Sequence, residues 1–244
     1  MNYRTIIGDR KIELEQDYMG KKAWPEFMQH DAIVGKYWAN LYSDFLDYQF
    51  AVKSDNSLVG VGNSIPVHWT GDFSKLPAQG LDWAMEKAVD DKKENQIPNL
   101  LVAVQILINL DLRSKGMSYK LLDSMKLVAK NKGIKQIALP VRPTLKHKYP
   151  LIPMQKYIEW TNEKGEPFDP WLRVHIKAGG KIVSVCSESM KIQGEISEWK
   201  EWTGLNFQSS GLYTIEKALC PINIDLANNI GEYIEPNVWI IHST

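Results

Sequence analysis

The sequence has few cysteines, no excess of either charge and no long apolar run. Only Cys186 and Cys220 are cysteines among 244 residues, and no CxxC pair is present, so a disulfide framework or structural zinc site is not expected. Lys plus Arg equals Asp plus Glu at 29 each, which gives no field that attracts nucleic acid. No stretch approaches the roughly 20 apolar residues of a membrane helix, and the charged N-terminus is unlike a signal peptide. We therefore expect a cytoplasmic protein without nucleic-acid or membrane partners.

Several motifs of common enzyme classes are also missing. The chain has no G-x-G-x-x-G dinucleotide fingerprint, no P-loop and no G-x-S-x-G nucleophile elbow. Its five histidines show no H-x-x-E-H or H-x-x-x-H spacing with acidic partners, so we predict no metal site. These absences argue against a Rossmann dehydrogenase, a nucleotide triphosphatase, a serine hydrolase and a metalloenzyme.

A strand that leads through a glycine turn into a helix is the most informative pattern present. The stretch from Leu100 to Leu110 is apolar on both faces, which is typical of a central strand, and the run LRSKGMSYKLL follows it. Gly116 permits a close approach to the backbone, and the first amides of a helix attract an anion. The pattern predicts a phosphate cradle with Arg113 and Lys115 at its mouth. The alternative is an ordinary strand-to-helix turn with two solvated basic residues.

The other predicted elements surround this unit. The pattern predicts amphipathic helices over 24–33 and 37–48, a strand–turn–strand hairpin over 48–69 and a helix over 80–95. A helix that ends at Gly133 and a strand over 134–141 complete a right-handed crossover between parallel strands. Asp169 and Pro170 open a further helix that ends at Gly179, before a strand over 181–186.

The cradle resembles the pyrophosphate-binding motif of the GNAT acyltransferases, which is Gln or Arg, two residues, Gly, one residue, and Gly or Ala. Here it is Arg113-Ser-Lys-Gly-Met-Ser118, and Ser118 departs from the pattern. The resemblance implies an α/β (α+β) fold with a mixed, mainly antiparallel central sheet, a splayed parallel pair and flanking helices. It covers residues 1–190, and we expect residues 191–244 to form a β-rich C-terminal extension packed on the same domain.

The resemblance also implies where an acyl-CoA would bind. Ile108 and Leu110 are expected beside the pantetheine arm, and the pyrophosphate is expected against the amides of Arg113, Ser114, Lys115, Gly116, Met117 and Ser118. The DPWLRVHIKAGGKIV segment aligns His175 with the family's tyrosine general acid. An imidazole titrates near neutrality, so His175 is the candidate catalytic residue; the alternative is a structural helix histidine.

The general base is left open by the sequence. No Asp or Glu lies within 100–110, and the amides of Gln105 and Asn109 can only position a water. A water chain or a carboxylate such as Asp44 or Asp47 would serve, or an acceptor with a low pKa would need no base. Backbone amides near Ile108 are candidates for the oxyanion site.

The segment over 142–168 is longer than the family usually has at this place. It is rich in basic and aromatic residues and contains Pro143, Pro150 and Pro153. We predict a substrate loop that uses Arg142, His147 and Tyr149. A solvated surface insertion is the alternative.

The sequence therefore predicts an enzyme, an N-acetyltransferase that transfers an acetyl or other acyl group directly from acyl-CoA to an amine of a small molecule or peptide. Two alternatives stay open: a non-catalytic acyl-CoA-binding or sensory domain, and an interaction module that binds no coenzyme. The acceptor, the acyl length and the oligomeric state are left open by the sequence.

Overall fold

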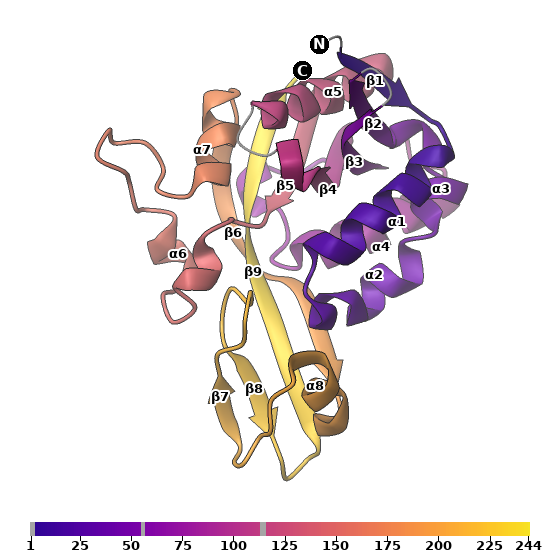
Figure 1. Ribbon diagram of the computed structural model, residues 1–244. Coiled ribbons are helices and arrows are strands. Elements are labelled where there is room, and N and C mark those ends of the chain that lie inside the picture. Colours follow the sequence, from indigo (N-terminus) through magenta and orange to yellow (C-terminus); the bar gives the residue numbers. More distant parts are fainter. Residues whose placement is uncertain (1–2, 55–56, 113–115) are drawn as a thin grey trace.

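A mixed β-sheet organises the molecule. The computed structural model describes residues 3–54, 57–112 and 116–244. The nine-stranded sheet has the order β1-β2-β3-β4-β5-β9-β8-β7, and β6 pairs with β9 (Figure 1). The strands are β1 (Tyr3–Ile7), β2 (Phe50–Ser54), β3 (Ser57–Val67), β4 (Leu100–Ile108), β5 (Gln136–Val141), β6 (Lys181–Gly194), β7 (Gly211–Tyr213), β8 (Ile222–Asp225) and β9 (Ile230–Ser243).

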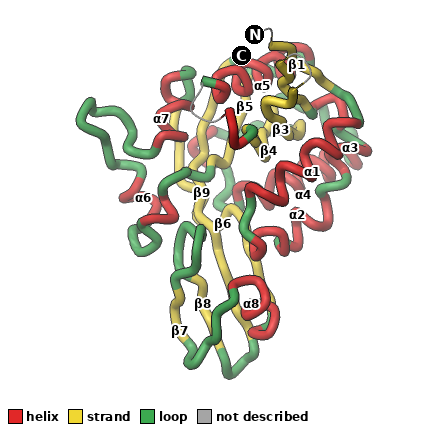
Figure 2. Tube along the Cα trace, viewed as in Figure 1, coloured by secondary structure: helices red, strands yellow, loops and turns green. Residues whose placement is uncertain are grey.

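Helices connect and cover these strands (Figure 2). The α-helices are α1 (Lys11–Ala23), α2 (Ala32–Tyr37), α3 (Asn40–Ser43), α4 (Gly80–Lys93), α5 (Met117–Asn131), α6 (Met154–Tyr157), α7 (Pro170–Lys177) and α8 (Ile196–Thr203). Short 3-10 helices occupy Glu26–His30, Leu46–Tyr48, Phe73–Lys75, Leu110–Leu112 and Lys146–Lys148.

Two apolar cores lie on the two faces of the sheet. Helix α5 contributes Leu121, Leu122, Met125 and Val128 to one core, as its amphipathic pattern predicts. The other core includes residues of α1, α4 and the segment between α1 and β2. Strand β4 contributes to both cores, through Leu101 on one face and Leu100 and Val102 on the other. Its continuous apolar run is therefore explained by burial on both faces.

The sheet is mainly antiparallel and has one parallel pair. Strands β4 and β5 pair in parallel from Leu100 opposite Gln136 to Val102 opposite Ala138. Helix α5 connects them, which is the predicted crossover. The remaining neighbours in the sheet, such as β3 with β4 and β5 with β9, are antiparallel. The predicted fold class is confirmed.

The N-terminal region differs from the prediction. Strand β1 and helix α1 were not predicted, because the charged N-terminal sequence carries no obvious apolar run. The two helices predicted over 24–33 and 37–48 are instead short α and 3-10 turns. Asp31 ends the first of these turns and caps α2, since its side chain accepts a hydrogen bond from the Val34 amide at 2.9 Å.

The C-terminal residues complete the sheet. Strand β9 pairs with β5 through Val238–Ser243 and with β6 through most of its length, so it lies between these two strands. The predicted boundary at residue 190 falls inside β6, and the division of the chain there stays a prediction. The lower part of β9 and β6 extends beyond the helical layers, where β7, β8 and α8 pack against it (Figure 1).

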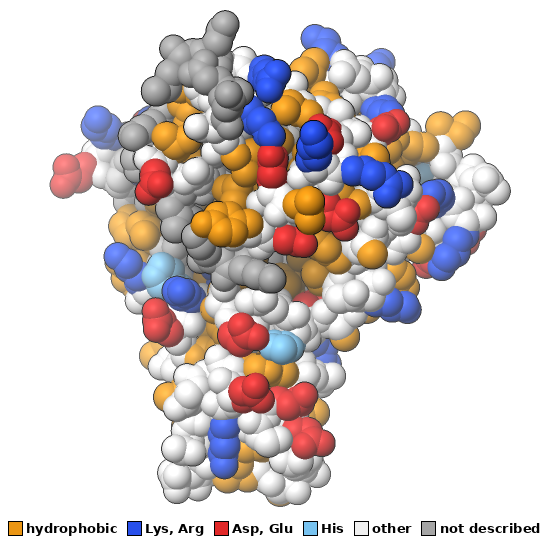
Figure 3. All heavy atoms as spheres, turned by 45° about the vertical axis from the view of Figure 1, so that its right-hand side comes forward, with side chains coloured by type: hydrophobic (Ala, Val, Ile, Leu, Met, Phe, Trp, Pro, Cys, Tyr) orange, Lys and Arg blue, Asp and Glu red, His pale blue; other side chains and the backbone are white. Residues whose placement is uncertain are grey.

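The surface carries charges of both signs. In the view of Figure 3, basic and acidic side chains are interspersed over the helical region, in keeping with the equal numbers of the two in the sequence. Within residues 3–54, 57–112 and 116–244, no helix is both long enough and apolar enough to cross a bilayer.

Candidate active site

The two parallel strands diverge after their first three residue pairs. Beyond Val102, β4 continues to Ile108 beside β3, while β5 continues to Val141 beside β9, and the described residues of β4 and β5 form no further pairs. A bulge lies where they separate, because Asn63 pairs with Gln105 and Ser64 with Ala103, which leaves Val104 unpaired. A bulge bends and twists its strand, so it helps to open the sheet at this point.

Gly116 is the described residue of the turn that leads into α5. Gly116 precedes α5 with φ of +76°, a left-handed conformation that favours glycine, and open space surrounds its Cα. Met117 is buried and Ser118 is half-buried. Ile108 ends β4 and packs against the core under α5. The predicted contacts Arg113, Ser114 and Lys115 lie outside the described residues, as does the side chain of Leu110.

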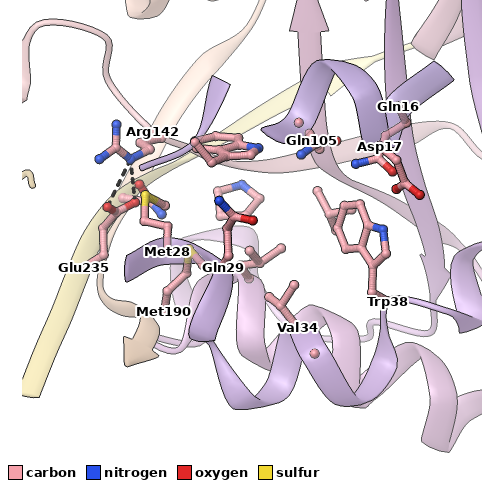
Figure 4. A pocket seen from close by; sticks show the side chains of 17 residues that line it. Gln16, Asp17, Met28, Gln29, Val34, Trp38, Gln105, Arg142, Met190 and Glu235 are labelled. Carbon is pink, nitrogen blue, oxygen red and sulfur yellow. Dashed lines mark hydrogen bonds and ion pairs between the residues drawn. The ribbon is translucent and has the colours of Figure 1, made fainter. Parts of the chain in front are cut away.

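A cavity of about 350 Å³ lies on the opposite side of the diverging strands, toward α1 and α2 (Figure 4). It reaches the opening, because Val104 of β4 and Pro140 of β5 both line it. Eight apolar or aromatic side chains share the wall with seven polar or charged ones. The wall comprises Gln16, Asp17, Gly20, Trp24, Met28, Gln29, Val34, Gly35, Trp38, Leu81, Val104, Gln105, Pro140, Arg142, Met190, Glu235 and Asn237.

Three amides of the cavity wall have an unsatisfied oxygen. Oε1 of Gln16, Oε1 of Gln105 and Oδ1 of Asn237 are buried and have no hydrogen-bond partner within the described part of the chain. Buried polar atoms are nearly always paired, so these three oxygens are acceptors that a water or the N–H and O–H donors of a ligand can satisfy. The torsion that orients a terminal amide is soft, so these oxygens can turn toward such a ligand.

The two ends of the cavity have different charge. Figure 4 shows the Arg142–Glu235 ion pair at one end and Asp17 at the other, with Gln105 and Gln29 between them. The ion pair is internally neutralised, whereas Asp17 is an exposed carboxylate. The cavity therefore favours a small ligand that is cationic at the Asp17 end.

Comparison with known proteins agrees with this architecture. The chain is 29% identical over 247 residues to the arginine N-acetyltransferase avaD of Aspergillus versicolor, an alignment that covers 90% of this chain and 84% of the relative. It also resembles the loading GNATL domain of CurA from Lyngbya majuscula, with a TM-score of 0.66 and 16% identity over 100% of this chain and 98% of that one. No protein-family model matches the sequence.

The chain therefore has the GNAT fold and is similar in sequence to an N-acetyltransferase. A second GNAT structure, the GphF GNAT-like decarboxylase in complex with isobutyryl-CoA, has a TM-score of 0.59 and 13% identity, and the match covers 100% of this chain and 99% of that one. At such identities the structural neighbours establish the fold and not the reaction.

Arg142 is the one predicted loop residue that lines the cavity of this GNAT domain. Its Nε donates to both carboxylate oxygens of Glu235, at 2.9 and 3.0 Å, and its Nη2 donates to the Lys217 carbonyl at 2.6 Å. Tyr233 donates its hydroxyl to Glu235 at 2.8 Å. Burial alone would lower the pKa of Arg142, but the Glu235 carboxylate outweighs it and raises that pKa. Arg142 therefore stays charged, and its ion pair with Glu235 fixes one end of the cavity.

His147 and Tyr149 lie in the 142–168 segment but away from the cavity wall. His147 is half-buried, with Nδ1 at 2.9 Å from the Thr144 carbonyl. Tyr149 packs edge-on against Trp160 and Phe168 at ring-centroid distances of 5.0 and 5.9 Å. This aromatic cluster also contains Tyr157, and it gives the segment a small core of its own.

Two buried polar residues tie this segment to the rest of the domain. Lys146 donates from Nζ to the carbonyls of Tyr149 and Leu219, at 2.8 and 2.6 Å. Asp169 caps α7 through the amides of Trp171 and Leu172, and it also accepts from the Leu145 amide and the Tyr157 hydroxyl. The segment is therefore a packed structural element, and its predicted role in substrate choice stays a prediction for His147 and Tyr149.

His175 lies in a buried histidine pair. It is fully buried, its Nδ1 is 2.9 Å from Nε2 of His242, and its ring packs against Trp171. Burial, followed by the repulsion from His242, holds the pKa of His175 well below its usual range. Burial and the charge of Lys126 lower the pKa of His242 to about 4. Both rings are therefore neutral at pH 7, and His175 does not line the cavity. The predicted acid role stays untested, and this environment disfavours a histidinium donor.

The carboxylates predicted as candidate general bases, Asp44 and Asp47, lie away from the cavity. Asp44 pairs with Lys92, and Asp47, whose side chain is 71% exposed, pairs with Lys132; neither lines the cavity. The carboxylates that do line it are Asp17 and Glu235 within the described residues. Sequence reasoning missed both. The helical spacing of Ile12, Gln16 and Met19 could have revealed α1 and so placed Asp17.

A pair of buried carboxyl groups lies where the helices α2 and α4 meet, near the cavity. Asp31, at the start of α2, and Asp82, in α4, are both buried, and Asp82 accepts from the Lys191 amide at 3.0 Å. Burial and the neighbouring Asp31 raise the pKa of Asp82 to about 8. Burial also raises the pKa of Asp31. The pair therefore retains a proton near pH 7, which spares the domain two adjacent buried charges.

Proposed function

We propose that this acyl-CoA-dependent N-acetyltransferase acetylates arginine, or a closely related cationic amine, bound in the cavity between α1, α2 and the β4–β5 opening. The observation that carries the proposal is an amino-acid-sized cavity at the strand opening with a carboxylate, Asp17, at its outer end. Its volume, about 350 Å³, is near the lower end of small-molecule sites, which span roughly 300–1,000 Å³. The 29% identical arginine N-acetyltransferase supports the same acceptor.

The coenzyme is proposed to bind on the α5 side of the opening. Gly116, Met117 and Ser118 open an α-helix of 15 residues, whose first amides and dipole suit a pyrophosphate. Ile108 lies where β4 leaves β5, beside the proposed path of the pantetheine arm. The acyl group would then reach the acceptor cavity between Val104 and Pro140.

The reaction needs little acid or base assistance from the protein. An α-amine loses its proton far more readily than a guanidinium, and a thiol has a pKa of about 8.5, so near neutral pH a fraction of the amine is free and the thiolate is a competent leaving group. The amine nitrogen attacks the thioester carbonyl, the C–S bond breaks, and the proton lost by nitrogen reaches sulfur through solvent. Backbone amides at the Val104 bulge are the proposed donors to the oxyanion.

The proposal is tested by thiol release from acetyl-CoA with a panel of amines at pH 7.5. We expect kcat/KM for arginine to exceed that for lysine and for leucine, because only arginine combines the chain length with a planar fork of donors. Coenzyme A binding without turnover of any amine would instead support the non-catalytic sensory alternative. Turnover that favours leucine would exclude a cation-selective cavity.

A further inference from the structure

The cavity separates the place where a cation is recognised from the place where the acyl group arrives. On the basis of the proposed function, we propose that arginine binds with its guanidinium at the Asp17–Trp38 end and is acetylated on its α-amino nitrogen. The guanidinium is then the recognised group and the α-amine the reacting one.

The two places lie on different elements. Val104 and Pro140 line the cavity from β4 and β5, at the point where these strands diverge. Asp17 lies on α1 and Trp38 at the C-terminal end of α2, outside the sheet. Figure 4 shows both of these side chains at the end of the cavity opposite the Arg142–Glu235 pair. An elongated ligand is thus needed to occupy both places.

The outer end has the chemistry that a guanidinium requires. A guanidinium has five N–H donors and no acceptor, and it pairs with carboxylates and stacks on aromatic faces. Asp17 supplies the carboxylate and Trp38 the aromatic ring. The neighbouring Gln16 is 5% exposed and its Oε1 lacks a partner among the described residues, so it can accept a further N–H.

The guanidinium is also the wrong nucleophile for this site. Its pKa exceeds 12, so at pH 7.5 fewer than about one molecule in 10⁴ has a neutral guanidine, and a neighbouring carboxylate makes that fraction smaller. The α-amine has a far lower pKa than the guanidinium, so a much larger fraction of it is neutral at the same pH. Its lone pair forms the N–C bond as the C–S bond breaks, and the products are Nα-acetylarginine and coenzyme A, with the amine proton transferred to sulfur.

The experiment locates the acetyl group in the product. The full-length protein is incubated with acetyl-CoA and arginine, and the product is assigned by tandem mass spectrometry and by NMR of the α-proton. We expect acetylation on the α-nitrogen only. Arginine whose α-nitrogen is already acetylated should release no coenzyme A, whereas arginine methylated on the guanidino group should remain a substrate.

Citrulline is the matched control acceptor, because it keeps the shape of arginine and replaces the cation with a neutral urea. We expect kcat/KM for citrulline to be at least tenfold lower, with acetylation still on the α-nitrogen. Trp38→Leu should raise KM for arginine several-fold, whereas Asp47→Asn, at a carboxylate outside the cavity, should leave it unchanged.

The outcomes separate this inference from the proposed function. Acetylation of a guanidino nitrogen would overturn the inference while leaving the enzyme an arginine acetyltransferase. Equal use of arginine and citrulline would overturn recognition of the cation, although the reacting nitrogen would still be the α-amine. Absence of arginine turnover, with acetylation of other amines, would overturn both.

Discussion

The 142–168 segment and the acceptor cavity differ in how their buried polar groups are hydrogen-bonded. Lys146 in the segment, and Asp169 directly after it, are buried and form several hydrogen bonds. On the cavity side, buried oxygens of Gln16, Gln105 and Asn237 have no partner within the described residues. An unmade buried hydrogen bond costs about 1–3 kcal/mol. In the first region, these buried polar groups are therefore satisfied by the protein itself. In the second region, the buried oxygens are left as acceptors that the donors of a ligand can satisfy.

Arg142 begins the 142–168 segment and also lines the cavity, so we expect its replacement to have the largest effect on stability. Arg142→Met would leave Glu235 buried without its cation, and we expect the free energy of unfolding to fall by about 3–5 kcal/mol. Thermal unfolding would show a decrease in Tm of roughly 10 °C. Adding Glu235→Leu should recover much of this loss. A small change in Tm for Arg142→Met would contradict a structural role for the pair.

Asp169 tests the structural region alone. Asp169→Ala removes the cap of α7 and leaves the Tyr157 hydroxyl without its acceptor, so we expect a loss of about 2–3 kcal/mol in chemical denaturation. KM for arginine should not change at temperatures where the variant is folded. Asp47→Ala, which breaks only an exposed ion pair, is the control and should cost less than about 1 kcal/mol. A large change in KM would place this segment in the acceptor site.

Substitutions at the two glycines that flank α5 can separate an effect on coenzyme binding from an effect of backbone strain. Gly116 and Gly133 have φ of +76° and +71°, and open space surrounds both. Gly116→Asp and Gly133→Asp should each cost about 1 kcal/mol of stability. Only Gly116→Asp should weaken coenzyme A binding in calorimetry, by tenfold or more, because it sets a negative charge beside the proposed pyrophosphate site. Equal affinity in the two variants would exclude the cradle.

The Asp31–Asp82 pair predicts a pH-dependent change in stability at the inner edge of the cavity region. Folded Asp82 keeps its proton up to a pKa of about 8, whereas in the unfolded chain its pKa is near 3.8. Between these values the folded state binds more protons, so stability falls as the pH rises, by at most about 1.4 kcal/mol per pH unit. Asp82→Asn should flatten the decrease between pH 5 and 8 in denaturant titrations. Parallel pH profiles of the two proteins would contradict this assignment.

Local patterns were sufficient to predict the centre of the fold. The apolar run at Leu100, the turn at Gly116 and the amphipathic helix after it encode a strand–helix–strand unit whose geometry is constrained by chain handedness. The cap at Asp169 was predicted for the same reason, because N-capping depends on adjacent residues. The fold of the unit on which the coenzyme is proposed to bind could thus be predicted from sequence, whereas the coenzyme contacts themselves stay a prediction.

The acceptor side depends on long-range contacts and could not be predicted in the same way. Asp17 reaches the cavity only because α1 packs against β3 and β4, and Glu235 only because β9 lies between β5 and β6. Such contacts join residues far apart in the chain; Arg142 and Glu235, for example, are 93 positions apart. His175 shows how a local pattern can mislead. Its place in the sequence matched a catalytic position, but tertiary packing buries it against His242.

The central claim is that Asp17 recognises the cation of the acceptor. It is tested most directly by steady-state kinetics of Asp17→Asn with arginine and with leucine, beside Asp47→Asn as a control on a carboxylate outside the cavity. The account predicts that Asp17→Asn raises KM for arginine by about tenfold or more, since a charge-assisted hydrogen bond contributes roughly 1.5–3 kcal/mol, with Tm and the kinetics of leucine unchanged. An unchanged KM for arginine in Asp17→Asn would contradict it.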